Sequence, residues 1–188
     1  MKKSKKIIIA LTIFIALSAV VLYYGSLSAL KTLYPCEYSD IVESNAKENN
    51  LSPWFVYAVI KCESDFVPNA VSYTGAVGLM QIMPDTFQWI SGKLKDNKAF
   101  EDAYEPETSV KYGCYLYGYL IDKFKNEETA IAAYHAGIGN VNKWLGDEKY
   151  SADGETLHTI PFPTTAKYVK KVIKTKNIYE KLYMRKDA

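Results

Sequence analysis

The stretch IKCESDFVPNAVSYTGAVGLMQIMPDT, residues 60–86, contains the features that decide the fold of this chain. An apolar segment ends at Glu63, and a polar loop then leads to a Gly-Ala-Val-Gly turn that begins at Gly75 and ends at Gly78. Glycine marks tight turns and positions where the backbone approaches another group closely. A single carboxylate followed by such a turn, and then by residues 79–83 with the two thioethers of Met80 and Met83, favours a functional site over plain core.

Residues 54–62, which precede Glu63, are predicted to form a buried helix. Ser52 and Pro53 supply a helix start signal, because serine is a good N-cap and proline fits the first helical position. The helix is apolar almost all round, as expected of a core helix. Glu63 then lies at its C-terminal end, where the helix dipole and desolvation both raise the pKa of a carboxyl group. An acid that stays protonated near neutral pH is suited to general acid catalysis.

The remaining chain predicts a single, mainly α domain. Apolar residues recur at helical spacing, and the start and stop signals predict helices at residues 39–49, 84–91, 106–125, 129–135, 141–145 and 166–183. We expect residues 93–104 to form a solvated connection, because they are charged and have no pattern. Residues 67–72 allow at most a small β-hairpin.

The N-terminus has the pattern of a membrane anchor or a signal peptide. MKKSKK, residues 1–6, is followed by an uncharged apolar run from residue 7 to residue 24. Such a run just reaches the length of a membrane span. We expect residues 1–6 to be cytoplasmic, residues 7–25 to be an uncleaved anchor rather than a cleaved signal peptide, residues 26–37 to be a linker, and residues 38–183 to form the extracytoplasmic domain. The alternative is secretion to the cell wall.

The composition excludes several other classes of function. When the four lysines of residues 1–6 are left out, 19 basic and 21 acidic residues remain. The sequence has no basic stripe of the kind that indicates nucleic-acid binding. Three cysteines and two histidines, with neither CxxC nor HExxH, predict no metal site and no cofactor. Whether two of Cys36, Cys62 and Cys114 form a disulfide is left open by the sequence.

A second catalytic carboxylate is not evident. Asp65 lies two residues after Glu63, and Asp85 resembles a helix-terminus residue. Most glycosidases need two carboxylates, so a single one indicates that the substrate supplies the second function.

Four blocks of the sequence resemble the soluble lytic transglycosylase family, whose fold is similar to that of goose lysozyme. These blocks are ESDF, AVSYTGAVGLMQIMPDT, AYHAGIGNV and IPFPTTAKYV, and the resemblance extends over about residues 38–180. It implies a lysozyme-like helical domain that acts on peptidoglycan. Family members cleave the bond between N-acetylmuramic acid and N-acetylglucosamine without consuming water, and they leave a 1,6-anhydro end.

The resemblance also implies roles for individual residues. Glu63 matches the catalytic acid, which then serves as base, and Ser72 matches a serine that hydrogen-bonds near the acid. Tyr134 matches a tyrosine whose hydroxyl lies near the acid. The sugar-binding turn is matched by Gly78, Leu79, Met80 and Gln81.

The chain departs from the family pattern at four positions. His135 and Ser109 stand where asparagine is usual, Thr164 replaces a glutamate, and Ala166 replaces a frequent arginine. Two alternatives stay open beside a transglycosylase: a muramidase on the same fold, which uses water, and a non-catalytic peptidoglycan-binding protein.

Overall fold

The computed structural model describes residues 2–184, and the side chains of residues 2–4, 6 and 10 are not described. The chain divides into two compact units. One contains residues 1–35 and 182–188, of which residue 1 and residues 185–188 lie outside the description, and the other contains residues 36–181.

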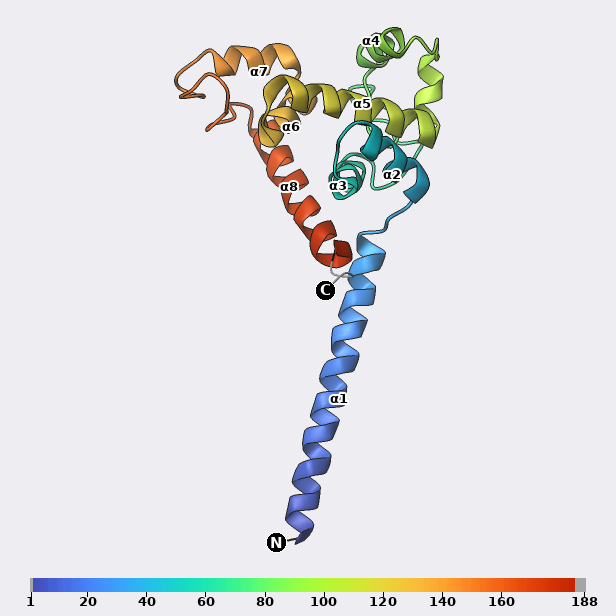
Figure 1. Ribbon diagram of the computed structural model, residues 1–188, viewed down its shortest axis with the longest axis vertical. Helices are drawn as coiled ribbons and strands as arrows, with labels where there is room; N and C mark the ends of the chain where they lie inside the picture. Colours follow the sequence, from blue (N-terminus) through green and yellow to red (C-terminus); the bar gives the residue numbers. More distant parts are fainter. Residues whose placement is uncertain (1, 185–188) are drawn as a thin grey trace. The chain divides into compact units, whose positions relative to one another are not determined.

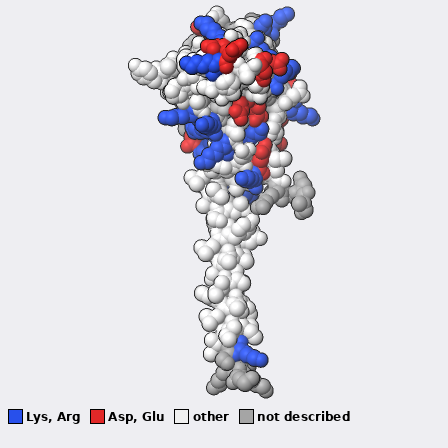
Figure 2. Space-filling model, turned by 90° about the vertical axis from the view of Figure 1, so that its left-hand side faces the viewer, with Lys and Arg blue, Asp and Glu red and all other residues white. Residues whose placement is uncertain are grey.

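The first unit is built on α1, Lys2–Leu33. Its segment Ile7–Leu33 is long and apolar enough to cross a membrane, and among the described residues no other helix meets that criterion. Twenty-seven helical residues span about 40 Å, against about 30 Å for the hydrocarbon core of a bilayer. Figure 2 shows a surface without charged side chains along the middle of this helix. The helix continues through most of residues 26–37, which the sequence analysis assigned to a linker.

In the same unit, the end of the last helix contacts the end of α1. The Tyr183 hydroxyl donates a hydrogen bond to the backbone carbonyl of Tyr34 at 2.7 Å. The Lys31 ammonium lies 5.6 Å from the centre of the Tyr183 ring. These contacts join residues that are about 150 positions apart in the sequence.

The second unit is helical, as the sequence predicts, and the described residues contain no β-strand. Its elements are α2 Ser39–Glu48, α3 Pro53–Glu63, α4 Pro84–Leu94, the 3₁₀-helix η1 Phe100–Tyr104, α5 Pro106–Phe124, α6 Glu127–Ala136, α7 Ile138–Leu145 and α8 Pro163–Tyr183. The region of the expected hairpin has only isolated β-bridges, in which Val77 pairs with Val71 and with Ile82. The described part of the chain therefore has the mainly α fold that we expected.

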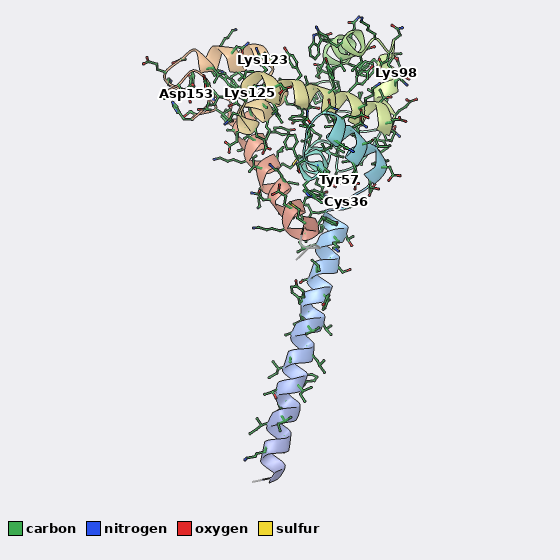
Figure 3. The ribbon with its side chains drawn as sticks, viewed as in Figure 1. Cys36, Tyr57, Lys98, Lys123, Lys125 and Asp153 are labelled. Atoms are coloured by element: carbon green, nitrogen blue, oxygen red, sulfur yellow. The ribbon has the colours of Figure 1, made fainter. Side chains whose placement is uncertain are left out.

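Helix α5 is the centre of this unit, and it packs against α2, α4, α6 and η1. Figure 1 shows it running between α6 at one end and α4 with η1 at the other. Aromatic contacts join the helices: Phe55 of α3 meets Tyr117 of α5 edge-on at 4.9 Å, and Tyr57 of α3 stacks on Tyr179 of α8 at 5.6 Å. Figure 3 shows Tyr57 inside the unit, with Lys98 and Asp153 at its opposite ends.

Two local predictions were wrong. Helix α4 does not end at Ser91 and Gly92 but continues to Leu94, since Ser91 is buried and its carbonyl accepts a hydrogen bond from Lys95 N at 2.8 Å. The connection at residues 93–104 is not irregular throughout, because η1 lies within it and buries Ala103.

Candidate functional site

Glu63 is the last residue of α3, a helix whose six central residues from Phe55 to Ile60 are buried. The helix therefore cannot rotate without exposing its apolar side chains, and its C-terminal end holds the carboxylate in a fixed place. The Glu63 side chain is partly buried at the edge of the core. This placement agrees with the one predicted from the sequence.

Two buried tyrosines form a hydrogen-bonded chain that ends on this carboxylate. The Tyr168 hydroxyl, from α8, donates to Glu63 Oε1 at 2.5 Å. The Tyr117 hydroxyl, from α5, lies 3.2 Å from that of Tyr168 and donates to it, because the Tyr168 proton is already directed at Glu63. Burial raises the pKa of both phenols well above 10, so both stay neutral donors.

Burial also raises the pKa of Glu63 from 4.5 to about 7. The hydrogen bond from Tyr168 and the positive charge of Lys171 oppose this effect but do not cancel it. Lys171 is held nearby, since its ammonium donates to the carbonyl of Cys62 at 2.9 Å. At pH 7 about half of the Glu63 side chains therefore carry a proton.

The hydrogen bond from Tyr168 determines which oxygen of Glu63 holds that proton. Oε1 already accepts from Tyr168, whereas no described residue donates to Oε2. A protonated Glu63 therefore has its proton on Oε2, where it is available to a bound molecule. This arrangement is that of a general acid with one oxygen held and the other ready to donate.

The predicted sugar-binding turn, residues 78–81, begins at Gly78, and glycine is required at this position. Its φ is +81°, and a Cβ atom at this position would lie 2.1 Å from the Ala103 carbonyl oxygen and 2.7 Å from Ser109 Oγ. The backbone of the turn thus packs directly on η1 and α5. A side chain here would push the turn away from both elements.

Three hydrogen bonds fix the turn against the helices around Glu63. Ser64 Oγ donates to the Leu79 carbonyl at 2.8 Å, and the Tyr134 hydroxyl donates to the Met80 carbonyl at 2.6 Å. The Met80 amide donates to Ser109 Oγ at 3.2 Å. Leu79 and Met80 are fully buried, and their carbonyls and the Met80 amide are engaged in these bonds, so the two residues fix the shape of the turn.

Gln81 and Ser72 are both engaged within this loop. Gln81 Nε2 donates to the carbonyls of Ala70 at 3.1 Å and Gly78 at 2.9 Å, which leaves Oε1 as its open polar atom. Ser72 Oγ accepts from the Ala76 amide at 2.9 Å. Within the described residues no hydrogen bond joins Ser72 to Glu63, so the expected contact of Ser72 with the acid stays a prediction.

Neither of the other nearby aspartates shares the environment of Glu63. Asp65 is exposed and forms an ion pair with Lys61. Asp85 is exposed in the first turn of α4. Across residues 2–184, no group of three or more His, Cys, Asp and Glu side chains is arranged to hold a metal ion.

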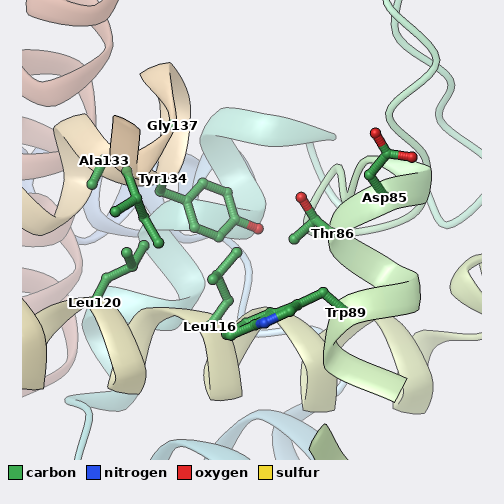
Figure 4. Close-up of a pocket in the computed structure, with 9 residues that line it drawn as sticks. Asp85, Thr86, Trp89, Leu116, Leu120, Ala133, Tyr134 and Gly137 are labelled. Atoms are coloured by element: carbon green, nitrogen blue, oxygen red, sulfur yellow. The ribbon is translucent and has the colours of Figure 1, made fainter. Parts of the chain in front are cut away.

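A pocket of about 340 Å³ adjoins Tyr134 and opens between α4, α5, α6 and α7. In Figure 4, Tyr134 points across this pocket toward Thr86, with Asp85 above and Trp89 below. The walls are mostly apolar and are formed by Asp85, Thr86, Trp89, Leu116, Leu120, Ala133, Tyr134, Gly137 and Ile138. Tyr134 thus lines this pocket and also hydrogen-bonds to the turn next to Glu63.

His135 lies in the last turn of α6 and contacts the partner of the acid. Its ring centre is 4.6 Å from that of Tyr168, and its Nδ1 lies 3.0 Å from Thr165 Oγ1. Burial lowers the pKa of His135. His135, one of the four residues that depart from the family pattern, therefore contacts Tyr168, the tyrosine that hydrogen-bonds to Glu63.

Tyr168, Tyr117 and Ser64 were not predicted as site residues from the sequence. The two tyrosines lie at apolar positions of their helices, and their rings are buried in the core. The available signal was the hydroxyl group, because a buried tyrosine usually needs a polar partner for it. The hydroxyl of Tyr117 meets that of Tyr168, which in turn meets the Glu63 carboxylate.

Comparisons with known proteins agree with this geometry. The family model of the transglycosylase SLT domain matches residues 40–156. The soluble lytic murein transglycosylase of Salmonella typhimurium is 32% identical over 163 residues, which cover 85% of this chain and 25% of that protein. The membrane-bound lytic murein transglycosylase C of Actinobacillus pleuropneumoniae is 28% identical and covers 76% of this chain and 46% of that protein.

Solved structures show the same relationship. An inactive glutamate-to-glutamine variant of the lytic transglycosylase Slt from Pseudomonas aeruginosa superposes with a TM-score of 0.72 at 30% identity, over 81% of this chain and 25% of that one. The 70 kDa soluble lytic transglycosylase of Escherichia coli also gives a TM-score of 0.72, at 27% identity, over 83% of this chain and 26% of that one. The chain spans about a quarter of the length of these soluble relatives. It belongs to the transglycosylase SLT family.

Proposed function

We propose that this chain is a peptidoglycan lytic transglycosylase, which cleaves the β-1,4 bond between N-acetylmuramic acid and N-acetylglucosamine and leaves 1,6-anhydromuramoyl ends. Several relatives are named as lytic murein transglycosylases, which supports this activity. The observation that carries the proposal is the Glu63 carboxyl group, which has a pKa raised to about 7 and is held through Oε1 by Tyr168 with Oε2 left open.

In this mechanism Glu63 acts twice. First, protonated Oε2 gives its proton to the glycosidic oxygen, and the bond from that oxygen to C1 of the muramic sugar breaks. The Glu63 carboxylate then accepts the proton of the C6 hydroxyl as that oxygen bonds to C1. Protons balance without water, and the substrate N-acetyl group stabilises the positive charge that develops on the sugar.

A pKa of about 7 suits both steps, because an acid that also serves as base works best near its own pKa. Tyr168 keeps its hydrogen bond in both states and strengthens it when Glu63 is ionised. Ser72, the turn Gly78–Gln81 and Tyr134 bind the sugars around the scissile bond. Within the turn, Gln81 Oε1 is the side-chain polar atom available for this contact.

The N-terminal helix anchors the enzyme in the cell membrane, with the catalytic unit on the outer side. The apolar segment Ile7–Leu33 follows a lysine cluster, which stays cytoplasmic by the positive-inside rule. One relative is named as membrane-bound, which supports this arrangement. The peptidoglycan strands and the membrane are thus the partners of the chain.

The test of the catalytic role is the Glu63→Gln variant, assayed for release of soluble fragments from purified peptidoglycan. The full chain in mild detergent is compared with Glu43→Gln, which removes an exposed carboxylate on α2. We expect Glu63→Gln to lose at least about 1,000-fold in rate and Glu43→Gln to keep the parent rate, because one catalytic group often accounts for several orders of magnitude. Equal lysis by both variants would show that Glu63 is not the catalytic group, and a parent chain that releases no fragments would be a peptidoglycan-binding protein.

One observation favours a second candidate, a hydrolytic muramidase. Asp85 lines the same pocket as Tyr134, and an ionised carboxylate there could activate a water molecule. The products separate the two reactions, because hydrolysis leaves reducing muramic ends.

A further inference from the structure

Trp89 of α4 is the most prominent aromatic group of the pocket, and the transglycosylase mechanism does not use it. It lines the pocket together with Leu116 of α5 and Tyr134 of α6. In Figure 4 its ring extends from α4 toward Leu116 and forms the lower side of the pocket. The side chain is only partly buried, so it contributes less to the core than a tryptophan can.

The rings of two tyrosines of α5 lie next to the Trp89 ring. Tyr119 meets it edge-on with the ring centres 5.2 Å apart, and Tyr115 lies 6.2 Å away. Tyr119 is itself 40% exposed. An aromatic ring held by such contacts keeps its orientation without being enclosed.

Polar groups also lie around Trp89, and the Lys93 ammonium is 5.9 Å from the centre of its ring. No described residue accepts a hydrogen bond from its indole N–H, and Asp85 and Thr86 add two oxygen-bearing side chains to the same pocket. An apolar wall with a few converging polar groups is typical of a site for a small ligand. A pyranose ring has this character, with C–H groups on its face and hydroxyls at its edge.

The pocket adjoins the surroundings of the acid at Tyr134. The Tyr134 ring stacks on Tyr117 at 4.0 Å, and Tyr117 belongs to the hydrogen-bonded chain that ends on Glu63. Because Tyr134 and Trp89 line one pocket, a polymer that extends from Glu63 past Tyr134 meets Trp89. A short ligand held only at the acid does not extend that far.

We propose that Trp89, supported by Tyr119, is a stacking platform for a sugar ring of the glycan strand away from the bond at Glu63. The platform makes binding stronger for long strands than for short ones. This inference rests on the proposed function, because it takes the ligand to be peptidoglycan glycan.

The test is the affinity of defined glycan fragments for the full chain in mild detergent, measured by calorimetry in a Glu63→Gln background so that nothing is cleaved. The fragments are a tetrasaccharide and an octasaccharide of alternating N-acetylglucosamine and N-acetylmuramic acid. We expect Trp89→Ala to weaken octasaccharide binding about 10-fold, equivalent to about 1.4 kcal/mol, and tetrasaccharide binding about twofold. Trp89→Phe, which keeps a flat ring, restores most of the octasaccharide affinity.

The control is Phe162→Ala, since Phe162 is 45% exposed but lies outside the pocket, against Trp144. If Trp89→Ala loses its thermal unfolding transition, Tyr119→Ala takes its place, with an expected threefold loss. Octasaccharide affinity that is equal in parent, Trp89 variants and Tyr119→Ala overturns the platform.

Equal octasaccharide affinity in all these variants overturns the platform alone, and other outcomes overturn the proposed function. A chain that binds no fragment at all overturns both the proposed function and the platform. A chain that binds the octasaccharide through Trp89 but gives hydrolytic products keeps the platform and loses the transglycosylase assignment.

Discussion

Replacing Glu63 by glutamine is expected to change stability in a pH-dependent way, whatever the reaction. Burial raises the pKa of Glu63 to about 7 in the folded protein, against 4.5 for an ordinary glutamate. Between these values the folded chain keeps a proton that the unfolded chain has released. The free energy of unfolding of the parent therefore falls as the pH rises from about 4.5 to about 7.

The size of the effect follows from the shift in pKa. Each pKa unit is worth about 1.4 kcal/mol, so the ionised carboxylate costs the folded protein about 3 kcal/mol above pH 7. Glutamine has nearly the same shape, accepts the same hydrogen bond from Tyr168 and does not ionise. The variant should therefore gain up to about 3 kcal/mol on the parent between pH 4 and pH 8.

The assay is thermal unfolding of the full chain in mild detergent at pH 4, 6 and 8. For a protein of this size, about 3 kcal/mol corresponds to a rise in Tm of about 6–12 °C for Glu63→Gln at pH 8. Glu43→Gln, on the exposed side of α2, reports the effect of removing one negative charge alone. A difference between Glu63→Gln and the parent that is constant with pH would refute the raised pKa.

Three further predictions concern the neighbours of Glu63. Tyr168→Phe removes a hydrogen bond that lowers the pKa of Glu63, so the pH profile of lysis should move upward and the rate should fall about 10-fold; an unchanged profile would contradict the role of this bond. Gly78→Ala places a methyl group 2.1 Å from the Ala103 carbonyl at a positive φ, and should cost about 3 kcal/mol or more in thermal unfolding; a smaller loss would mean that the turn can shift. Asp85→Asn should reduce the rate of lysis less than 10-fold, whereas a loss above about 100-fold would favour a water-activating base and a muramidase.

The helices could be predicted from the sequence because their signals are local. Pro53 and Pro106 mark the starts of α3 and α5, and apolar spacing defines their buried faces. The end of α4 could not be predicted, because Ser91 and Gly92 resemble a helix stop. A glycine within a helix costs about 1 kcal/mol. The helix nevertheless continues, with Ser91 buried, its hydroxyl donating to Asp96 Oδ1 and its carbonyl accepting from Lys95 N.

The site was predictable only in part. Glu63 could be predicted because it is a carboxylate at the end of an apolar helix, and both features are visible in the sequence. Its hydrogen bond to Tyr168 joins residues 105 positions apart, and nothing in an apolar stripe distinguishes a tyrosine that reaches a carboxylate from one that fills the core. The same holds for Trp89, whose position on the pocket wall depends on how α4 packs against α5.

The central claim is that Glu63 closes a ring instead of activating water. Mass spectrometry of the muropeptides released from purified peptidoglycan by the full chain tests it most directly, with Glu63→Gln as the blank. We expect 1,6-anhydromuramoyl ends, which are lighter than the corresponding reducing ends by one water molecule, about 18 Da, because no water is added in the cleavage. Release of reducing muramic ends alone would contradict this mechanism.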